Sequence, residues 1–362
     1  MIWYLLNILI VTIAYLWPIK QTEVDDGFGI SKTRKKWVCI VGSFGWIIFS
    51  GFRHLSIGAD TIAYKHVFEK TATMHWDELF QDLYNKFILG EKILDPGYRI
   101  VEKFVQVFTN DYQIFLIIIA VLFFTSMGVF LYKFSSDPYL GYILFSTLFY
   151  SFFAITGHRQ TIATAIVVFM GTFLIKKKMF IPFLIITLLA STIHFSCLCF
   201  LPFYFISKIK INKATLLMYW AGIAGAFVFR NQLFSFLQSI IGYEDYKQTE
   251  GARVNTFLFV LLIVGVVVTF FHKKLLEGDN CEIVQMSINA LMLACFFCPL
   301  ILINENTMRV VQYFSLFLMI ILPELIFIFS KKTDRTIIKM IFVGLLCFLL
   351  FKDPLSYKFF WQ

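Results

Sequence analysis

The chain has 362 residues, of which 59% are hydrophobic and only 15% are charged. A soluble domain is about half apolar and about a quarter charged, so this composition excludes a soluble protein and predicts a polytopic membrane protein. The net charge of +9 comes from short Lys and Arg clusters between apolar runs, which is how membrane topology is encoded, and we expect no nucleic-acid partner.

Long apolar runs recur along the whole chain. Because a spanning helix needs about 20 mostly apolar residues, they predict an all-α integral membrane bundle of about 11–12 transmembrane segments, as a single domain over 1–362. Membrane β-barrels instead show short segments of alternating hydrophobicity. The run 179–206 is either one long span or a hairpin, and its flanking lysines favour a hairpin that turns near His194. The other candidate spans lie near 2–17, 37–52, 113–132, 138–155, 160–175, 214–229, 254–271, 284–303, 309–330 and 336–351.

The distribution of Lys and Arg predicts the orientation of these spans. Short connections such as 32–36, 176–178 and 331–339 contain most of the basic clusters and should therefore face the cytoplasm. Both termini then face outward. The longest connection, 53–112, becomes an extracytoplasmic loop, and 230–253 becomes a second one.

The long loop is predicted to contain interfacial helices. In 75–88 the Trp, Leu and Phe residues recur at helical spacing, with acidic and basic residues on the other face. This pattern is typical of a helix that lies on the outer leaflet of a membrane. The segment 98–108 repeats it more weakly, and Asp95-Pro96-Gly97-Tyr98 has the composition of a turn between the two.

Polar and ionisable side chains gather at the outer ends of the predicted spans. Charge at a membrane mouth is costly unless it is paired or used, so their convergence on one side predicts a binding or active site. The segment 51–64, GFRHLSIGADTIAY, contains the densest group. The full set is Arg53, Asp60, Thr61, Tyr64, Asp95, Tyr98, His158, Arg159, Gln160, His194, Ser196, Arg309, Gln312 and Tyr313.

Two arginines, Arg159 and Arg309, follow short turns and begin apolar helices. A cation at a helix N-terminus opposes the helix dipole, so each needs an anionic partner, for which a phosphate is suited. The alternative for an arginine is simple contact with lipid headgroups. Asp60 and Asp95 have the alternative of helix capping or turn formation.

The chemistry that fits this set is transfer at an anionic leaving group. Paired arginines would neutralise a departing diphosphate, while a carboxylate or a histidine accepts the proton of an attacking hydroxyl. A P-loop, a dinucleotide fingerprint and a nucleophile elbow are absent from the sequence. Cys295 and Cys298 have metal-site spacing but lie within a span, without His or acidic partners. We therefore expect no cofactor and no metal.

These motifs, in this order, resemble the EpsG-like family of bacterial polytopic membrane proteins of exopolysaccharide and capsule synthesis, which are similar to Wzy oligosaccharide-repeat polymerases. The resemblance covers about residues 1–330, and the family more often has Glu at the position of Asp95. The motifs are Gly51-Phe52-Arg53 with Gly58, Asp60-Thr61 and Tyr64; Asp95-Pro96-Gly97-Tyr98; Arg159-Gln160-x-Ile162-Ala163; His194-x-Ser196; and Arg309.

The resemblance implies transfer of a growing glycan from undecaprenyl diphosphate to the next lipid-linked repeat unit, at the outer face of the bacterial cytoplasmic membrane. On that basis Arg53, Arg159 and Arg309 would bind the diphosphate. Asp60 would be the general base, with His194 and Asp95 as alternatives. Sugar would contact Tyr64, Tyr98, Gln160 and Tyr313. The expected partners are the lipid bilayer and a flippase and chain-length regulator of the same pathway.

A lipid-linked oligosaccharide flippase and a membrane acyltransferase are the alternative functions. A flippase needs polar residues along the membrane midplane as well, whereas the polar set of this chain is one-sided. An acyltransferase would need a His–acid couple toward the cytoplasmic side, where His272 adjoins Lys273 instead. A non-catalytic partner of a polysaccharide assembly complex is a further alternative.

Overall fold

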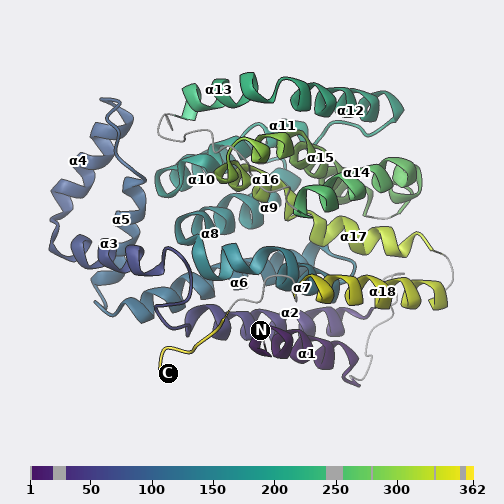
Figure 1. Ribbon diagram of the computed structural model, residues 1–362, viewed down its shortest axis with the longest axis horizontal. Helices are drawn as coiled ribbons and strands as arrows, with labels where there is room; N and C mark the ends of the chain where they lie inside the picture. The colour runs from purple at the N-terminus through teal and green to yellow at the C-terminus, as the bar shows by residue number, and fades with distance from the viewer. Residues whose placement is uncertain (1, 19–29, 242–255, 279, 330–331, 351–355) are drawn as a thin grey trace. The chain divides into compact units, whose positions relative to one another are not determined.

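The computed structural model describes residues 2–18, 30–241, 256–278, 280–329, 332–350 and 356–362. Contacts between residues divide the chain into two compact units. Unit 1 comprises Met1–His194 and Phe329–Gln362, and unit 2 comprises Phe195–Ile328. Every regular element in the described residues is a helix (Figure 1), which confirms the all-α class.

Unit 1 contains the N-terminal helices, the three helices of the long loop and the last helix. The first stretch of unit 1 ends at His194, where α10 ends in an extended residue. A helix therefore ends where the sequence predicts a turn, and the hairpin itself stays a prediction. The elements are α1 (Ile2–Leu16), α2 (Lys32–Gly51), α3 (Thr61–Thr73), α4 (Trp76–Phe87), α5 (Pro96–Gln106), α6 (Tyr112–Phe134), α7 (Pro138–Leu144), η1 (Phe145–Phe149), η2 (Ser151–Thr156), α8 (His158–Thr164), η3 (Ala165–Met170), α9 (Gly171–Lys176), α10 (Phe180–Ile193) and α18 (Lys332–Leu350).

Unit 2 contains the remaining helices and short helical turns. Its longest elements are α14 and α15, which pack against each other. The elements are η4 (Phe195–Phe200), α11 (Phe203–Ile206), α12 (Lys213–Val228), α13 (Arg230–Ile241), α14 (Thr256–Leu275), α15 (Cys281–Phe297), η5 (Cys298–Leu302), η6 (Glu305–Thr307), α16 (Met308–Ser315) and α17 (Leu318–Phe327).

Several helices are long and apolar enough to cross a membrane, which makes the chain a multi-pass membrane protein. In the described part of the chain there are four, and a fifth arises if a pair bent by 52° counts as one span. All five fall on predicted spans, whereas the predicted total and the orientation of the termini stay predictions. The four are Tyr112–Phe134, His158–Lys176, Thr256–Leu275 and Cys281–Leu302, and the bent pair is Glu305–Ser315 with Leu318–Phe327.

The core of unit 1 lies where α2 packs along α6. Trp46 is fully buried there, stacks on Phe124 and donates a hydrogen bond of 3.2 Å to Ser146 Oγ. The hydroxyl groups of Ser43 and Tyr142 lie 2.6 Å apart in the same layer. Buried polar groups in a membrane bundle need such partners, because lipid offers none.

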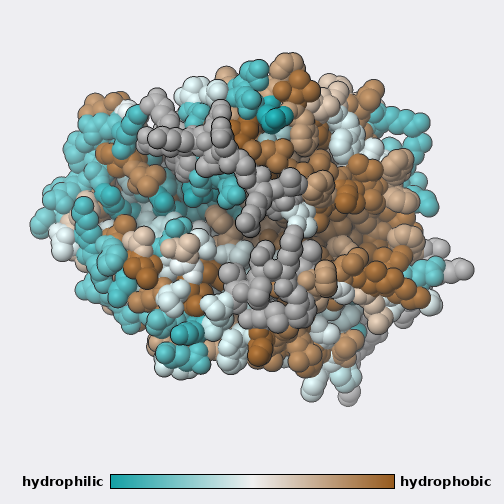
Figure 2. Space-filling model, in the orientation of Figure 1, coloured by the Kyte–Doolittle hydropathy of each residue, from teal (hydrophilic) through white to brown (hydrophobic). Residues whose placement is uncertain are grey.

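The long loop folds into α3, α4 and α5, which stand beside the bundle helices of unit 1 in Figure 1. The predicted helix 75–88 is α4, and the weaker one is α5, which begins one residue after Asp95. Hydrophilic residues gather over these helices in Figure 2, although Phe80 and Phe104 remain 55% and 61% exposed. Their contact with a leaflet stays a prediction.

The C-terminal residues of the chain pair with the segment that follows α2. Arg53 and Phe359 form an isolated antiparallel bridge. His54 N donates to Lys358 O, and Phe360 N donates to Phe52 O, each over 2.9 Å. The end of the chain therefore covers the backbone around Arg53.

Gly97 permits the close approach of α5 to α10. A Cβ at this position would lie 2.0 Å from Thr192 Oγ1 and 2.7 Å from the Thr192 carbonyl carbon. We expect Gly97→Ala to lower the free energy of unfolding by about 1–3 kcal/mol, the usual cost of overpacking. A thermal unfolding curve in detergent tests this. The matched control is Gly344→Ala in α18, because Gly344 has no neighbour within 4 Å of such a Cβ and lies within a helix, where alanine is unstrained. An unchanged melting temperature in Gly97→Ala would contradict the packing argument.

Candidate functional site

Three motifs that are distant in sequence meet in unit 1 around Asp95. Its Oδ2 accepts a hydrogen bond from Arg159 Nη1 at 2.9 Å and lies 3.1 Å from His194 Nδ1. Lys86 Nζ lies 3.9 Å from the other carboxylate oxygen. The three partners come from the start of α8, the end of α10 and α4. We call Asp95, Arg159 and His194 the Asp95 cluster.

The backbone of Asp95 is unusual as well. It adopts a left-handed conformation, with φ of 44° and ψ of 58°, immediately before Pro96 begins α5. Aspartate tolerates this region better than most residues, but it still carries strain. Strain of this kind is found at functional sites, and here it coincides with a side chain that is only 1% exposed.

Asp95 is held as a carboxylate. Burial raises its pKa, but the hydrogen bond and charge of His194, together with Arg159 and Lys86, outweigh burial and hold the pKa below its ordinary value. The stabilisation from these cations is present above the ordinary pKa of Asp and is lost as pH falls through the lowered value. Asp95 is therefore a poor proton acceptor at neutral pH and a good partner for cations.

The contact with Asp95 assigns the proton positions on His194. An ionised carboxylate can only accept hydrogen bonds, so the nitrogen that faces it, Nδ1, carries the proton. In a neutral imidazole the other nitrogen, Nε2, then carries the lone pair that can take up a proton. A carboxylate that orients a histidine in this way is the arrangement of base and orienting group used in acyl-transfer enzymes.

Arg159 retains capacity to bind an anion. Its Nε donates to Tyr64 Oη at 3.2 Å and its Nη1 to Asp95, so three of its five N–H groups are not used by the described residues of the chain. The side chain is 20% exposed, and the guanidinium lies 5.5 Å from the centre of the Tyr64 ring. Arg159 is thus held in place by Tyr64 and Asp95 and remains partly accessible to a ligand.

Arg53 is buried and linked to the cluster through aromatic rings. It is 2% exposed, and its Nη2 lies 2.6 Å from His158 Nε2. Arginine can only donate, so His158 accepts with Nε2 and carries its proton on Nδ1. His158 stacks on Tyr64, with ring centres 4.4 Å apart. Arg53 therefore orients His158 and Tyr64, whereas Arg159 is the arginine of the two that remains partly exposed.

The turn that presents His158 and Arg159 is flanked by wide helical turns. The segments Ser151–Thr156 and Ala165–Met170 are π-helical, and Gly157 joins the first of them to α8. π-Helical turns are rare and occur frequently at functional sites. Their presence on both sides of one short helix supports a functional role for that helix.

Asp60 lies apart from these contacts. It is exposed at the start of α3 and makes no side-chain cap hydrogen bond. Gly58 before it has φ of 99°, and a Cβ there would lie 2.6 Å from Thr61 Oγ1, which explains the glycine in this motif. Among the residues that the structure describes, no side chain lies against Asp60 in the way that would make it a base, whereas His194 lies against a carboxylate.

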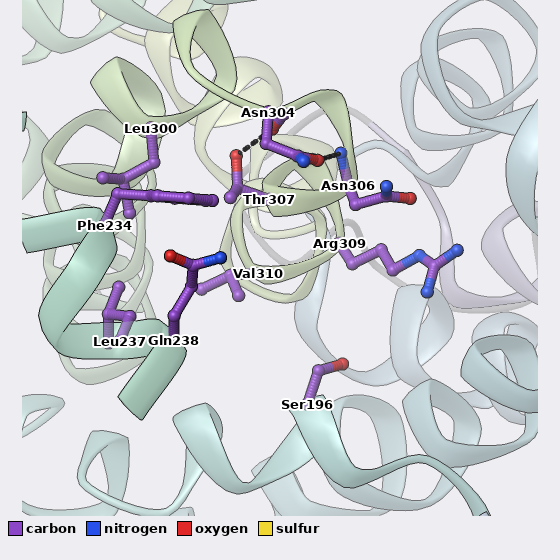
Figure 3. Close-up of a pocket in the computed structure, with 10 residues that line it drawn as sticks. All are labelled: Ser196, Phe234, Leu237, Gln238, Leu300, Asn304, Asn306, Thr307, Arg309 and Val310. Carbon is purple, nitrogen blue, oxygen red and sulfur yellow. Dashed lines mark hydrogen bonds between the residues drawn. The ribbon is translucent and has the colours of Figure 1, made fainter. Parts of the chain in front are cut away.

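Arg309 belongs to unit 2, where it lines a small pocket of about 70 Å³ whose surface is almost entirely apolar (Figure 3). Asn304 holds the turn at its rim, because its side chain accepts from Asn306 N at 2.9 Å and its carbonyl accepts from Thr307 Oγ1 at 2.7 Å. The other lining residues are Ser196, Phe234, Leu237, Gln238, Leu300 and Val310.

The proposed sugar contacts are mostly buried. Tyr98 and Gln160 are each 2% exposed, and Tyr313 is fully buried with its hydroxyl 3.1 Å from Ser196 Oγ. Tyr64 is half-buried and lies edge-on to Tyr98. Of the four, Tyr64 is therefore the most accessible to a ligand. The segment 243–253, a candidate for acceptor choice, lies outside the described residues.

Two residues near the site were not among the predicted ones, Lys86 and Glu102. Lys86 adds a cation beside Asp95. Glu102 is fully buried one helical turn after Tyr98. The signal for Glu102 was its position on the otherwise apolar face of a helix that also buries Tyr98 and Val105.

Comparison with known proteins supports the motif resemblance. The model of the EpsG family, a Wzy-like polymerase family, matches residues 36–360. No curated protein and no solved structure gives a significant match.

Proposed function

The chain belongs to the EpsG family, and from that premise we propose that it polymerises undecaprenyl-diphosphate-linked oligosaccharide repeat units into exopolysaccharide or capsule. The reaction takes place at the outer face of the bacterial cytoplasmic membrane. The observation that carries the proposal is the Asp95 cluster, in which an accessible guanidinium and an oriented imidazole share one buried carboxylate.

The reaction needs a leaving diphosphate and a deprotonated acceptor. The hydroxyl oxygen of the acceptor sugar forms a bond to the anomeric carbon of the donor glycan, while the bond from that carbon to the diphosphate oxygen breaks. His194 Nε2 takes the hydroxyl proton. Arg159 stabilises the negative charge that develops on the departing undecaprenyl diphosphate, and Asp95 stabilises the imidazolium.

A reconstituted assay tests this function. The purified chain in lipid nanodiscs, supplied with the lipid-linked repeat unit, should form a ladder of products that differ by one repeat unit. A deletion strain should display single repeat units on its surface. Loss of all surface glycan would indicate a flippase, and a full-length polymer lacking acyl groups would indicate an acyltransferase.

A further inference from the structure

Glu102 is a fully buried carboxyl group that the proposed reaction does not use. It lies on α5, and its Oε2 is 2.9 Å from Thr71 Oγ1 on α3. Helix α5 begins beside Asp95, and α3 contains Tyr64. A contact between these two helices therefore affects the positions of both residues.

The hydrogen bonds of Thr71 indicate whether Glu102 is protonated. Its hydroxyl oxygen is 2.9 Å from Glu102 Oε2 and also 2.9 Å from the carbonyl oxygen of Val67. A hydroxyl has one proton to donate, and an ionised Glu102 would compete with Val67 for it. A protonated Glu102 removes the conflict, because it donates to Thr71 and Thr71 donates to Val67.

The second oxygen of Glu102 agrees with this assignment. Oε1 is buried and makes no hydrogen bond of normal geometry within the described part of the chain. The neighbouring Tyr98 hydroxyl favours the carboxylate, but burial outweighs it, because a buried carboxylate oxygen without a hydrogen bond of normal geometry is costly and the carbonyl oxygen of a neutral acid is much less so. Both oxygens therefore favour the neutral form.

We propose that Glu102 is a positioning residue that remains a neutral acid at physiological pH and fastens α3 to α5, which sets Tyr64 and Asp95 around Arg159. This inference rests on the proposed function only for its effect on rate. The protonation state of Glu102 follows from the contacts alone.

The surroundings give the sign of the pH dependence. Burial raises the pKa of Glu102 to about 8, against the lowering effects of Thr71, Arg99, Arg159 and the Tyr98 hydroxyl. The other ionisable groups that face this region are Tyr98 on α5, Tyr112 on α6 and, beside Tyr98, Tyr64 on α3. Because the folded chain favours the neutral acid, its stabilisation is complete below the ordinary pKa of 4.5 and is lost as pH rises through about 8. The site should loosen on the alkaline side.

The experiment compares wild type with Glu102→Gln and Glu102→Ala in nanodiscs. Glutamine is neutral at every pH and its amide can donate to Thr71, so Glu102→Gln should polymerise at the wild-type rate at pH 7 and keep that rate above pH 8. Glu102→Ala should lose roughly 5- to 100-fold at pH 7, from the unfilled space and the lost hydrogen bond. The control is Glu91→Gln, an exposed carboxylate in the same loop.

Infrared spectroscopy reads the protonation state without the reaction. Wild type should show the C=O stretch of a protonated carboxyl at pH 7, which disappears near pH 8 and is missing from Glu102→Gln. Absence of this band from wild type would overturn the inference, even if polymerisation occurs. An identical alkaline fall in rate for wild type and Glu102→Gln would overturn the positioning role. The band without any ladder would instead reject the proposed function and support the neutral acid.

Discussion

Replacement of Arg159 by alanine is expected to lower the rate of ladder formation by roughly 10²–10³-fold, the cost of removing one donor to a developing negative charge. Arg159 is the exposed cation of the Asp95 cluster and is fixed by Tyr64 and Asp95. Arg159→Lys should recover little of this loss, because an ammonium group keeps the charge but not the planar fork that contacts both partners and a phosphate. The measurement is the initial rate with saturating lipid-linked donor.

Arg99 supplies the matched control for this variant. It forms an ion pair of the same length, 2.9 Å, with Asp82 in the same loop, yet it lies outside the Asp95 cluster. Arg99→Ala should keep the wild-type rate within a few-fold, since a partly exposed pair contributes about 0–1 kcal/mol. Equal losses in the two variants would mean that loop stability, and not phosphate binding, explains the effect.

Replacement of His194 by alanine is expected to lower the rate by about 10²–10⁴-fold, the range for loss of a general base. The side chain is 2% exposed, so the variant leaves a space that added imidazole can enter, and imidazole should restore part of the rate. Asp95→Asn should be nearly as slow, because the N–H₂ group of the amide can donate to Nδ1. The ring proton of His194 then lies on Nε2, which can no longer accept a proton. The double variant should be little slower than either single variant.

Variants of Asp60 and His66 serve as controls for the assignment of His194 as the general base. Asp60→Asn tests the base preferred from the sequence, and an exposed carboxylate without partners should change the rate only slightly. His66 is 73% exposed, so His66→Ala controls for loss of a histidine from unit 1. A large loss in Asp60→Asn with a normal rate in His194→Ala would reverse the assignment of the base.

Sequence periodicity located the helices well, because their cause is local. The spacing of Trp and Phe in 75–88 and the Asp-Pro-Gly turn after it predicted α4 and the start of α5 to within a residue or two. The lengths of the individual helices were less predictable. The apolar run 138–155 is divided into α7 and two π-helical turns, and such local widening depends on packing against neighbours that the pattern does not encode.

The candidate site was predictable as a set of residues but not as a geometry. Asp95 and His194 are 99 positions apart, and no local rule states that Gly97 lets their helices touch. The family resemblance makes Asp60 a candidate base, although an aspartate immediately before a helix is equally the pattern of a helix cap. Glu102 was overlooked because a single carboxylate on an apolar face is read as a surface residue unless its burial is known.

The pairing of the last residues with the segment after α2 constrains how the chain is threaded through the membrane. Backbone groups of Phe52 and Phe360 that hydrogen-bond over 2.9 Å occupy the same side of the bilayer. The chain between them must therefore cross an even number of times, whatever the hydropathy of the individual segments. If α1 and α2 both span as the sequence predicts, the total is even and the two termini share a side; we therefore predict 12 crossings rather than 11 among the about 11–12 that apolar length allows.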